Sequence, residues 1–499
     1  MQSFLKRILS LSACAVIVFS AASCGEKANT DNTTTTAANG EATTTATAAT
    51  TLDPAHTPLE LPVVDLGGFE FNVASQTATD TYRQFDSEEE TGEPMNDALY
   101  KRNSTIEDRY NVSIKQTLIG DITANVSKAI LAGDDAYTIV VGSLNNGGNS
   151  IHSLANSHLL LDYNDVPYLQ ESIEKAWWDQ NLRENLAINN KLYYNTGDIV
   201  LYDDMRIAIM YFNKGMFAKE GLDYPYKYVL DGTWTIDKLV ELTRGINKDI
   251  NGDGKMDQYD QWGLMSQYEN GLHMFHAAGE KIAGLDKDGV PTLTFNSPRA
   301  LEVIGKVLGV SIDGETMYHA DGITGLSAGS TSVWTEASLY FQDDRFLMRT
   351  SVFEPIVRDL RAMPTDFGIL PYVKYDEKQE NYYSHVEVGG YVVGIPMTSD
   401  PEKTGLILEA LAYESMSTIT PAFYELSLNS KVLRDNESEA MLDIIFKSKH
   451  YDLGYLFNIG GYASVPRTLV QSKSTDFVSR FDALETAAQT ALKKLADEY

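Results

Sequence analysis

One twelve-residue loop, 249–260, carries oxygen-bearing side chains at a spacing that could bind a hard cation. Calcium prefers about six to eight oxygen ligands, and alternating acids on a tight loop supply them. Gly254 stands at the sixth position, where the chain must turn sharply through a conformation that glycine adopts easily. The candidate ligands are Asp249, Asn251, Asp253, Asp257, Asp260 and the backbone carbonyl of Lys255.

This spacing matches the loop of an EF-hand, and it predicts a structural Ca²⁺ that stiffens the surface. Asp260 replaces the usual final Glu, and its shorter side chain should weaken binding. Thr235 and the apolar spacing after it predict a helix before the loop, whereas 262–265 does not look like an exiting helix. The pattern therefore indicates half an EF-hand; the alternative is an Asn/Asp/Gly-rich turn without metal.

Other catalytic or metal-binding signatures are weak. His273 and His276 are three residues apart in an expected helix, but no Glu completes an HExxH order, so we do not expect zinc. The chain has neither a Walker loop nor a serine elbow. A pair of catalytic carboxylates could still lie among its 70 acidic residues.

The first residues predict export. Lys6 and Arg7 precede an apolar run, 8–22, which is too short to cross a bilayer, since crossing needs about 20 residues, but is typical of a secretory signal. The small residues before Cys24 resemble a bacterial lipoprotein box, although Ala21 stands where Leu is commonest. We therefore expect a signal peptide at 1–23 and lipidation of Cys24. The alternative is ordinary cleavage and a freely secreted protein.

Residues 24–58 predict a lipid anchor followed by a disordered linker. The segment is rich in Thr and Ala and has no large apolar cluster, so it cannot form a core. A flexible tether of this length reaches roughly 30 Å. Acyl chains contribute about 0.8 kcal/mol per buried CH₂, so lipidation would hold the protein on the extracytoplasmic face of the cell membrane.

Composition limits the possible functions further. The formal charge is −30, and it becomes −32 once Lys6 and Arg7 leave with the signal peptide. This acidity excludes a general nucleic-acid binder, which needs a basic surface, and argues against lying flat on anionic lipid. Cys14 lies in the signal peptide, so a lipidated Cys24 would leave the folded part without a thiol and dependent on a large core. That part exceeds what one core usually holds, which predicts two lobes.

Strands and helices are expected to alternate. Phe69 to Val73 alternates at period two, and the short apolar run 137–141 is typical of a buried parallel strand. Adjacent Trp177 and Trp178 should open a helix, where both cannot face inward. The expected strands are 61–74, 111–116 and 137–141, and the expected helices 96–110, 122–132 and 481–499; together they indicate an α/β fold.

A set of segments occurs in a familiar order from about Gly67 to the C-terminus. They are 160–164 (LLDYN), 177–179 (WWD), 191–194 (KLYY), 211–217 (YFNKGMF), 232–235 (GTWT), 367–371 (FGILP) and 394–396 (GIP). With this order behind a lipoprotein box and a Thr-rich tether, the chain resembles the extracellular solute-binding proteins of ABC importers, the family that includes maltodextrin-binding proteins.

The resemblance implies a periplasmic-binding-protein-like fold of two α/β lobes, with an interlobe cleft and several chain crossovers. Lobe 1 would comprise 59–203 plus 367–412, and lobe 2 would comprise 204–366 plus 413–499. The first crossing would be at 207–212, and 367–371 would return to lobe 1. Ligand contacts would lie just after the strands, at Gln76, Thr77, Asn145, Asn146, Asp203, Asp204, Phe353 and Glu354. For each of these the alternative is a solvated loop residue or, for Phe353, a core position.

The function implied is capture of a small solute, most readily an oligosaccharide, by lobe closure and its delivery to an ABC permease. We expect a monomer and no enzymatic activity. Two other classes stay open: a surface-anchored glycoside hydrolase and an adhesin that holds an insoluble glycan. Recovery of intact ligand distinguishes the first from a hydrolase, and a deep cleft rather than a flat face distinguishes it from an adhesin.

Overall fold

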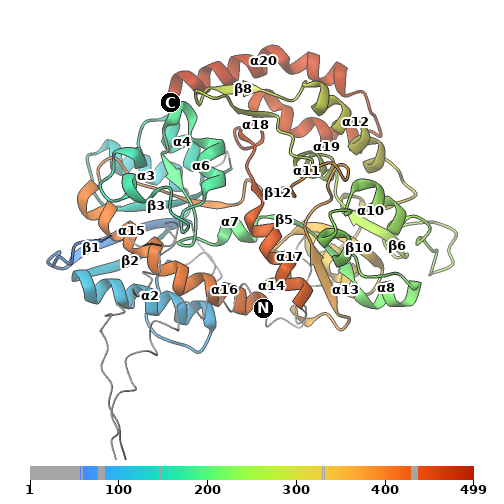
Figure 1. Cartoon of the computed structure of the whole chain (residues 1–499), viewed down its shortest axis with the longest axis horizontal. Helices are drawn as coiled ribbons and strands as arrows, with labels where there is room; N and C mark the ends of the chain where they lie inside the picture. The colour runs from blue at the N-terminus through green and yellow to red at the C-terminus, as the bar shows by residue number, and fades with distance from the viewer. Residues whose placement is uncertain are drawn as a thin grey trace, which may run out of the picture. The chain divides into compact units, whose positions relative to one another are not determined.

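The computed structural model describes residues 57, 60–76, 85–145, 148–328, 330, 332–428 and 436–499. The chain divides into two units, 1–57 and 58–499, and every helix and strand described lies in the second (Figure 1). The predicted signal peptide, Cys24 and nearly all of the tether lie outside the described residues. None of the described helices is both long and apolar enough to cross a membrane.

The first of two five-stranded sheets has the order β2-β1-β3-β13-β4. β1 pairs in parallel with β2 and β3, and β13 pairs antiparallel with β3 and β4. All of β3 is buried, as its apolar run predicts. The strands are β1 (Phe69–Gln76), β2 (Val112–Ile119), β3 (Ile139–Ser143), β4 (Tyr194–Asn195) and β13 (Tyr391–Gly394).

The second sheet has the order β11-β5-β10-β6-β9. β10 is parallel to β6, β6 is parallel to β9, and β5 runs antiparallel to both β10 and β11. Figure 1 shows β1, β2 and β3 on the left and β5, β6 and β10 on the right. The strands are β5 (Ala208–Asn213), β6 (Trp262–Ser266), β9 (Met317–His319), β10 (Phe346–Val352) and β11 (Phe367–Leu370).

Two short ladders complete the strands. β12 (Ser384–His385) pairs in parallel with β14 (Lys449–His450), and β7 (Ala283–Leu285) forms a hairpin with β8 (Pro291–Leu293). β12 comes after the strands of the second sheet in sequence and precedes β13 of the first, so the β12–β14 ladder belongs to the connections between the sheets.

Helices cover the first sheet. The side chain of Glu93 caps α2, the first helix among the described residues, and Asn111 ends it in the left-handed conformation. α15 and α16 pack on α2, so segments late in the chain contact segments early in the chain. The helices from this part of the chain are α2 (Pro94–Tyr110), α3 (Ile122–Leu131), α4 (Ile151–Asn156), η3 (Tyr163–Asp165), α5 (Leu169–Ser172), α6 (Gln180–Leu186), η4 (Ile188–Asn190), α15 (Pro401–Ser417) and α16 (Ile419–Leu428).

The remaining helices lie around the second sheet and the connections. Thr235 accepts a hydrogen bond from the Lys238 amide and caps α10, as predicted. They are α7 (Tyr202–Met205), α8 (Lys214–Glu220), α9 (Tyr226–Leu230), α10 (Ile236–Thr243), α11 (Asn270–Ala277), α12 (Pro298–Ser311), η5 (Ala320–Gly322), α13 (Val333–Gln342), α14 (Glu354–Arg358), η6 (Leu360–Ala362), α17 (Asn436–Lys447), α18 (Leu453–Leu456), η7 (Ile459–Ser464), α19 (Val465–Gln471) and α20 (Phe477–Glu498).

Two expectations are corrected. Residues 367–371 do not return the chain to the first sheet, because β11 pairs with β5 of the second; the return comes later, at β13. The expectation that Trp177 and Trp178 cannot both face inward is also wrong. Both are buried, and both indole N–H groups donate to the buried Glu409. The exact lobe boundaries stay a prediction.

Candidate functional site

The chain passes between the two sheets at 196–207, through α7, and again at 371–390, through β12. These passes lie side by side, since Ile207 forms a β-bridge with Val386 and β12 pairs with β14. Figure 1 shows α7 and β12 between the two sheets. We call 196–207, 371–390 and 449–452 the connecting segments. Any motion of one sheet against the other must bend them.

One ammonium group on these segments holds three carboxylates, two of them on the segments and the third on Asp179, just before α6. Lys449 Nζ lies 3.1 Å from Asp179, 2.7 Å from Asp203 and 2.6 Å from Asp204. Burial raises the pKa of Asp203 to about 7, although Lys449 opposes the shift. Burial likewise opposes the charge on Lys449, but the surrounding carboxylates raise its pKa well above the ordinary value. The ammonium therefore stays charged and fixes β14 to α7.

A second ion cluster joins the connections to the second sheet. Arg206, directly after α7, donates to Glu354 at 2.9 Å and to Glu387 at 2.5 Å. Arg358 donates to the same Glu354 at 3.0 Å. Burial disfavours the charge on Arg206, but Glu387 and Glu354 raise its pKa overall. Glu354 opens α14 directly after β10, so this cluster lies at the carboxyl end of a central strand.

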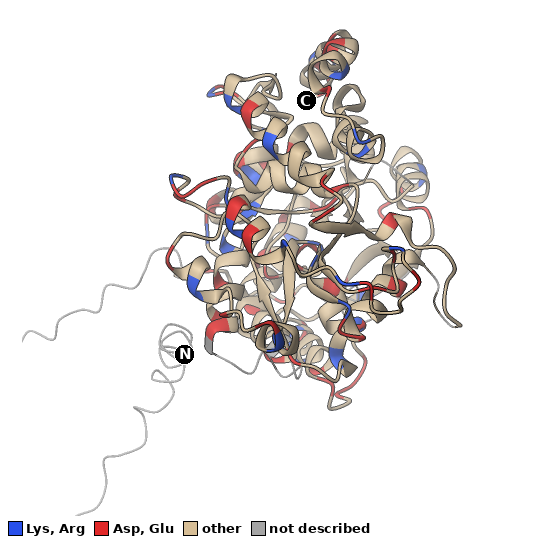
Figure 2. Cartoon of the chain, turned by 90° about the vertical axis from the view of Figure 1, so that its right-hand side faces the viewer, with Lys and Arg blue, Asp and Glu red and all other residues tan. Residues whose placement is uncertain are grey.

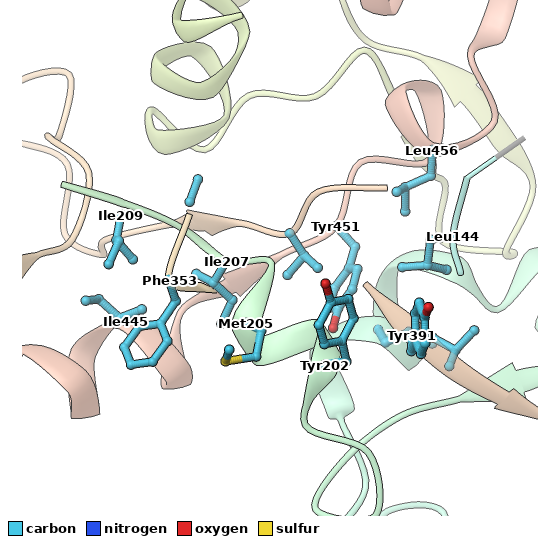
Figure 3. Close-up of a cluster of buried hydrophobic side chains, with 14 of the residues drawn as sticks. Leu144, Tyr202, Met205, Ile207, Ile209, Phe353, Tyr391, Ile445, Tyr451 and Leu456 are labelled. Atoms are coloured by element: carbon cyan, nitrogen blue, oxygen red, sulfur yellow. The ribbon is translucent and has the colours of Figure 1, made fainter. Parts of the chain in front are cut away.

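A continuous series of polar contacts runs from that end of β10 to the first sheet. The Tyr202 hydroxyl donates to Glu354 at 3.1 Å, and the Tyr202 ring centre lies 4.7 Å from that of Tyr391. The Tyr391 hydroxyl donates to Gln76, the last residue of β1. Figure 3 shows the Tyr202 and Tyr391 side chains close to each other, near Tyr451. Aromatic rings, a carboxylate and an amide thus meet beyond strand ends of both sheets, where open α/β sheets bind ligands.

Figure 2 shows acidic and basic residues along ribbons throughout the fold, so charge alone does not mark this site.

The predicted ligand residues divide into groups. Gln76 and Glu354 belong to this polar series, and Asn145 lies two residues beyond β3. Asp203 and Asp204 bind Lys449, and Asp203 is fully buried, so the Asp203 carboxylate is not presented to a solute in this conformation. Thr77 and Asn146 lie outside the described residues.

The structure corrects the prediction for Phe353. Its ring is fully buried and contacts Phe423 and Phe446, with ring centres 5.7 and 5.5 Å away. A ring with no exposed surface cannot stack on a solute. Phe353 is therefore a core residue; Figure 3 shows it beside Ile445 and Ile207.

The predicted calcium loop closes where Lys248 pairs with Gln261, and it leads into β6 rather than a helix. The Asp249 carboxylate accepts hydrogen bonds from the backbone amides of Gly252 and Gly254, at 2.6 and 2.9 Å. Gly254 has a φ of 78°. Asp260 is fully buried and accepts two further amides, at 3.1 and 2.9 Å.

The oxygen donor set of this loop suits a hard cation, and each carboxylate keeps lone pairs beyond these bonds. In the described part of the chain, however, no three His, Cys, Asp or Glu side chains converge closely enough to hold a metal ion as they stand. Calcium binding therefore stays a prediction.

Sequence reasoning missed Tyr202, Arg206, Glu387 and Lys449. Their partners lie far away in the chain: Lys449 is 246 positions from Asp203, and Arg206 is 181 from Glu387. No local spacing could have connected them. The available signal was the run from Lys449 to Asp452, where two ring residues stand between two opposite charges.

No family model matches the chain, and no curated protein matches its sequence. Solved structures do share its fold. The cyclic α-maltosyl-1,6-maltose binding protein from Arthrobacter globiformis aligns over 86% of this chain and 100% of its own, with a TM-score of 0.55 and 16% identity. A cyclo/maltodextrin-binding protein complexed with maltotetraose aligns over 86% of this chain and 97% of its own, with a TM-score of 0.53 and 15% identity.

A third structure is the ABC substrate-binding protein Lmo0181 from Listeria monocytogenes, in complex with cycloalternan. It aligns over 86% of this chain and 99% of its own, with a TM-score of 0.51 and 13% identity. All three are binding proteins. At these identities the likeness establishes the fold: the chain has the α/β fold of ABC solute-binding proteins, which confirms the predicted fold class.

Proposed function

We propose that this protein captures an oligosaccharide outside the cytoplasm and delivers it, unchanged, to an ABC permease. The observation that carries the proposal is the polar series Gln76–Tyr391–Tyr202–Glu354, which lies where several chain passes join the two sheets. The solved structures with this fold bind maltotetraose, cycloalternan or a cyclic maltosyl-maltose, so α-glucosides are the first solutes to test.

The chemistry of the series suits sugars. A carboxylate that accepts sugar hydroxyl protons forms charge-assisted hydrogen bonds, which are stronger than neutral ones. Tyr202 and Tyr391 are each 3% exposed in this conformation, so their flat apolar ring faces would meet the C–H faces of a pyranose only once the lobes open. A solute that contacts groups from both sheets would stabilise the closed arrangement of the lobes by its differential affinity.

Calorimetric titration against linear and cyclic α-glucans tests the proposal, together with chromatography of the released ligand. We expect binding at about micromolar Kd or tighter and recovery of intact sugar. Glu354→Gln should weaken binding, whereas Glu171→Gln, which changes an exposed acid on α5, should not. Cleaved sugar would indicate a hydrolase, and binding confined to insoluble polymer would indicate an adhesin.

Calcium is a separate proposal, supported by the all-oxygen donors of 249–260 and the positive φ of Gly254. Bound Ca²⁺ would neutralise acids that otherwise repel one another. We expect calcium to raise the melting temperature and a chelator to reverse the change. Asp253→Ala should abolish the response, and Asp313→Ala, outside the loop, should retain it. An unchanged melting temperature with calcium would remove the proposal.

Membrane anchoring rests on the sequence alone, through the segment that ends at Cys24. We propose that lipid on Cys24 holds the protein, as a monomer, at the extracytoplasmic face of the membrane. Expressed in a bacterium, the protein should appear in the membrane fraction with an acylated N-terminal cysteine, detected by mass spectrometry. Cys24→Ala should release it; membrane association that survives this change would contradict the proposal.

A further inference from the structure

Four histidines lie close together where the connecting segments pack against α11. His273 and His276 lie one turn apart on α11, His385 lies on β12, and His450 lies on β14. All four are buried, with exposures of 1%, 0%, 1% and 4%. We call these residues the histidine cluster. It joins two connecting strands to a helix that comes after β6 of the second sheet.

The rings are in close contact. The His385 ring centre lies 4.2 Å from that of His276 and 5.3 Å from that of His273. His450 lies 5.8 Å from His276, and Tyr455 packs against His385 at 4.6 Å. At such separations in a low-dielectric interior, two protonated imidazoles would repel strongly.

Hydrogen bonds are unequally shared among the four. His276 Nε2 contacts Asp452 at 2.7 Å, and His450 Nε2 contacts the Glu280 carbonyl at 3.3 Å. His273 Nδ1 contacts the Tyr372 hydroxyl at 3.3 Å. Neither ring nitrogen of His385 has a hydrogen-bond partner among the described residues. A proton added to His385 would therefore meet no acceptor.

Charged groups around the cluster do not compensate for several added protons. The carboxylates that face it are Asp452 and Glu387, and Glu387 already binds Arg206. Arg206 acts on His273 and Lys281 on His450, and both cations oppose protonation. The other titratable neighbours are the phenols of Tyr372, Tyr383 and Tyr455, which carry no charge at neutral pH.

We infer that the histidine cluster is an acid-sensitive latch, which holds β12 and β14 against α11 while His273, His385 and His450 are neutral and releases them as these three residues gain protons. Histidine outside the fold is protonated below about pH 6.5. Opening the connecting strands would let the buried rings charge in water, so acid favours the open form. The inference does not depend on the proposed solute.

Burial lowers the pKa of His273 to about 4 and that of His450 to about 3, and lowers that of His385 well below its ordinary value. A folded pKa below the unfolded one means that stability is complete above about pH 6.5 and declines as the pH falls toward the folded value. Each such histidine makes the opening equilibrium about tenfold more favourable at pH 5.5 than at pH 7.5.

Amide hydrogen exchange at pH 7.5 and 5.5, corrected for intrinsic exchange rates, tests this inference on the unmodified protein. We expect protection in β12, β14 and α11 to fall at least about tenfold more than protection in β1 and β3. An equal change in both regions, or none in either, would overturn the inference.

Two variants test which residues are responsible. His385→Phe removes the ring nitrogens and should reduce the acid-induced loss of protection about tenfold. His152→Phe is the matched control, because His152 is also buried with a pKa lowered to about 3, but it lies on α4 against Tyr194 and Leu144. It should leave the response of β12 and β14 unchanged. A His385→Phe response equal to that of the unmodified protein would overturn the inference.

Discussion

The sheets and the segments that connect them bury different kinds of side chain. β3 and β5 are wholly buried and almost continuously apolar. The connecting segments instead bury charged and polar side chains, among them Lys449, Asp203, His385 and His450.

This difference assigns different physical roles. Burial of apolar surface stabilises the fold by roughly 25 cal/mol per Å², but it does not require one particular geometry. A buried ion pair recovers little more than its own desolvation cost, but it tolerates only one geometry. We therefore expect the sheets to supply most of the folding stability and the connections to specify how the chain passes between them.

Lys449→Met should break this arrangement most severely. The change leaves Asp179, Asp203 and Asp204 buried without their cation, and removal of one member of a buried ionic group costs about 3–5 kcal/mol. Chemical denaturation measures the loss. Lys447→Met, which removes an exposed ion pair with Asp443, should cost below about 1 kcal/mol. Equal losses would mean that the connections do not depend on this cluster.

Glu409 offers a pH dependence opposite to that of the histidine cluster. It is 1% exposed on α15 and accepts hydrogen bonds from Ser172, Trp177 and Trp178. Burial nevertheless raises its pKa from 4.5 to about 7. Because the folded pKa exceeds the unfolded one, its stabilisation is complete below about pH 4.5 and is lost as the pH rises through about 7.

Glu409→Gln should therefore remove this slope. Between pH 4.5 and 8, the difference in unfolding free energy between the unmodified protein and the variant should change by about 3 kcal/mol, at about 1.4 kcal/mol per pKa unit. Denaturation at several pH values measures it, with Glu402→Gln, an exposed change on the same helix, as the control. Parallel curves for the protein and the Glu409 variant would contradict the expectation.

Phe353→Leu should have the smallest effect on unfolding free energy, and it tests whether Phe353 belongs to the apolar core or to the connections. Phe353 adjoins the connecting segments, because its amide donates to the Ile207 carbonyl at 3.0 Å, but its ring belongs to an apolar cluster. We expect a loss of about 1 kcal/mol in unfolding free energy, as for a near volume-conserving core change, and unchanged sugar affinity. A large loss of affinity at constant stability would restore Phe353 as a ligand contact.

Local elements could be predicted well from the sequence. The apolar run 137–141 predicted β3, and the segment 96–110 predicted α2. Thr235 was correctly predicted to cap α10. In each case the decisive interactions are within a few residues. The resemblance to solute-binding proteins, rather than local patterning, placed Gln76 and Glu354 after strand ends.

The errors share a cause. The segment of β11 is short and apolar, and its composition cannot show which sheet it joins; the partner strand β5 lies about 155 residues earlier. Trp177 and Trp178 both face inward because Glu409, more than 230 positions away, accepts both indoles. Isolated charges such as Lys449 look like surface residues until their distant partners are known. The charge density of 22% gave no means of choosing among them.

The position of β13 dictates when this protein can fold. β3 and β4 are neighbours in the sequence of strands, but the first sheet joins them only through β13, which ends at Gly394. A growing chain must therefore expose two unpaired strand edges until most of its length has been made. Such long-range closure is slow and leaves intermediates prone to aggregation, so we expect the first sheet to be completed only after most of the chain has been made.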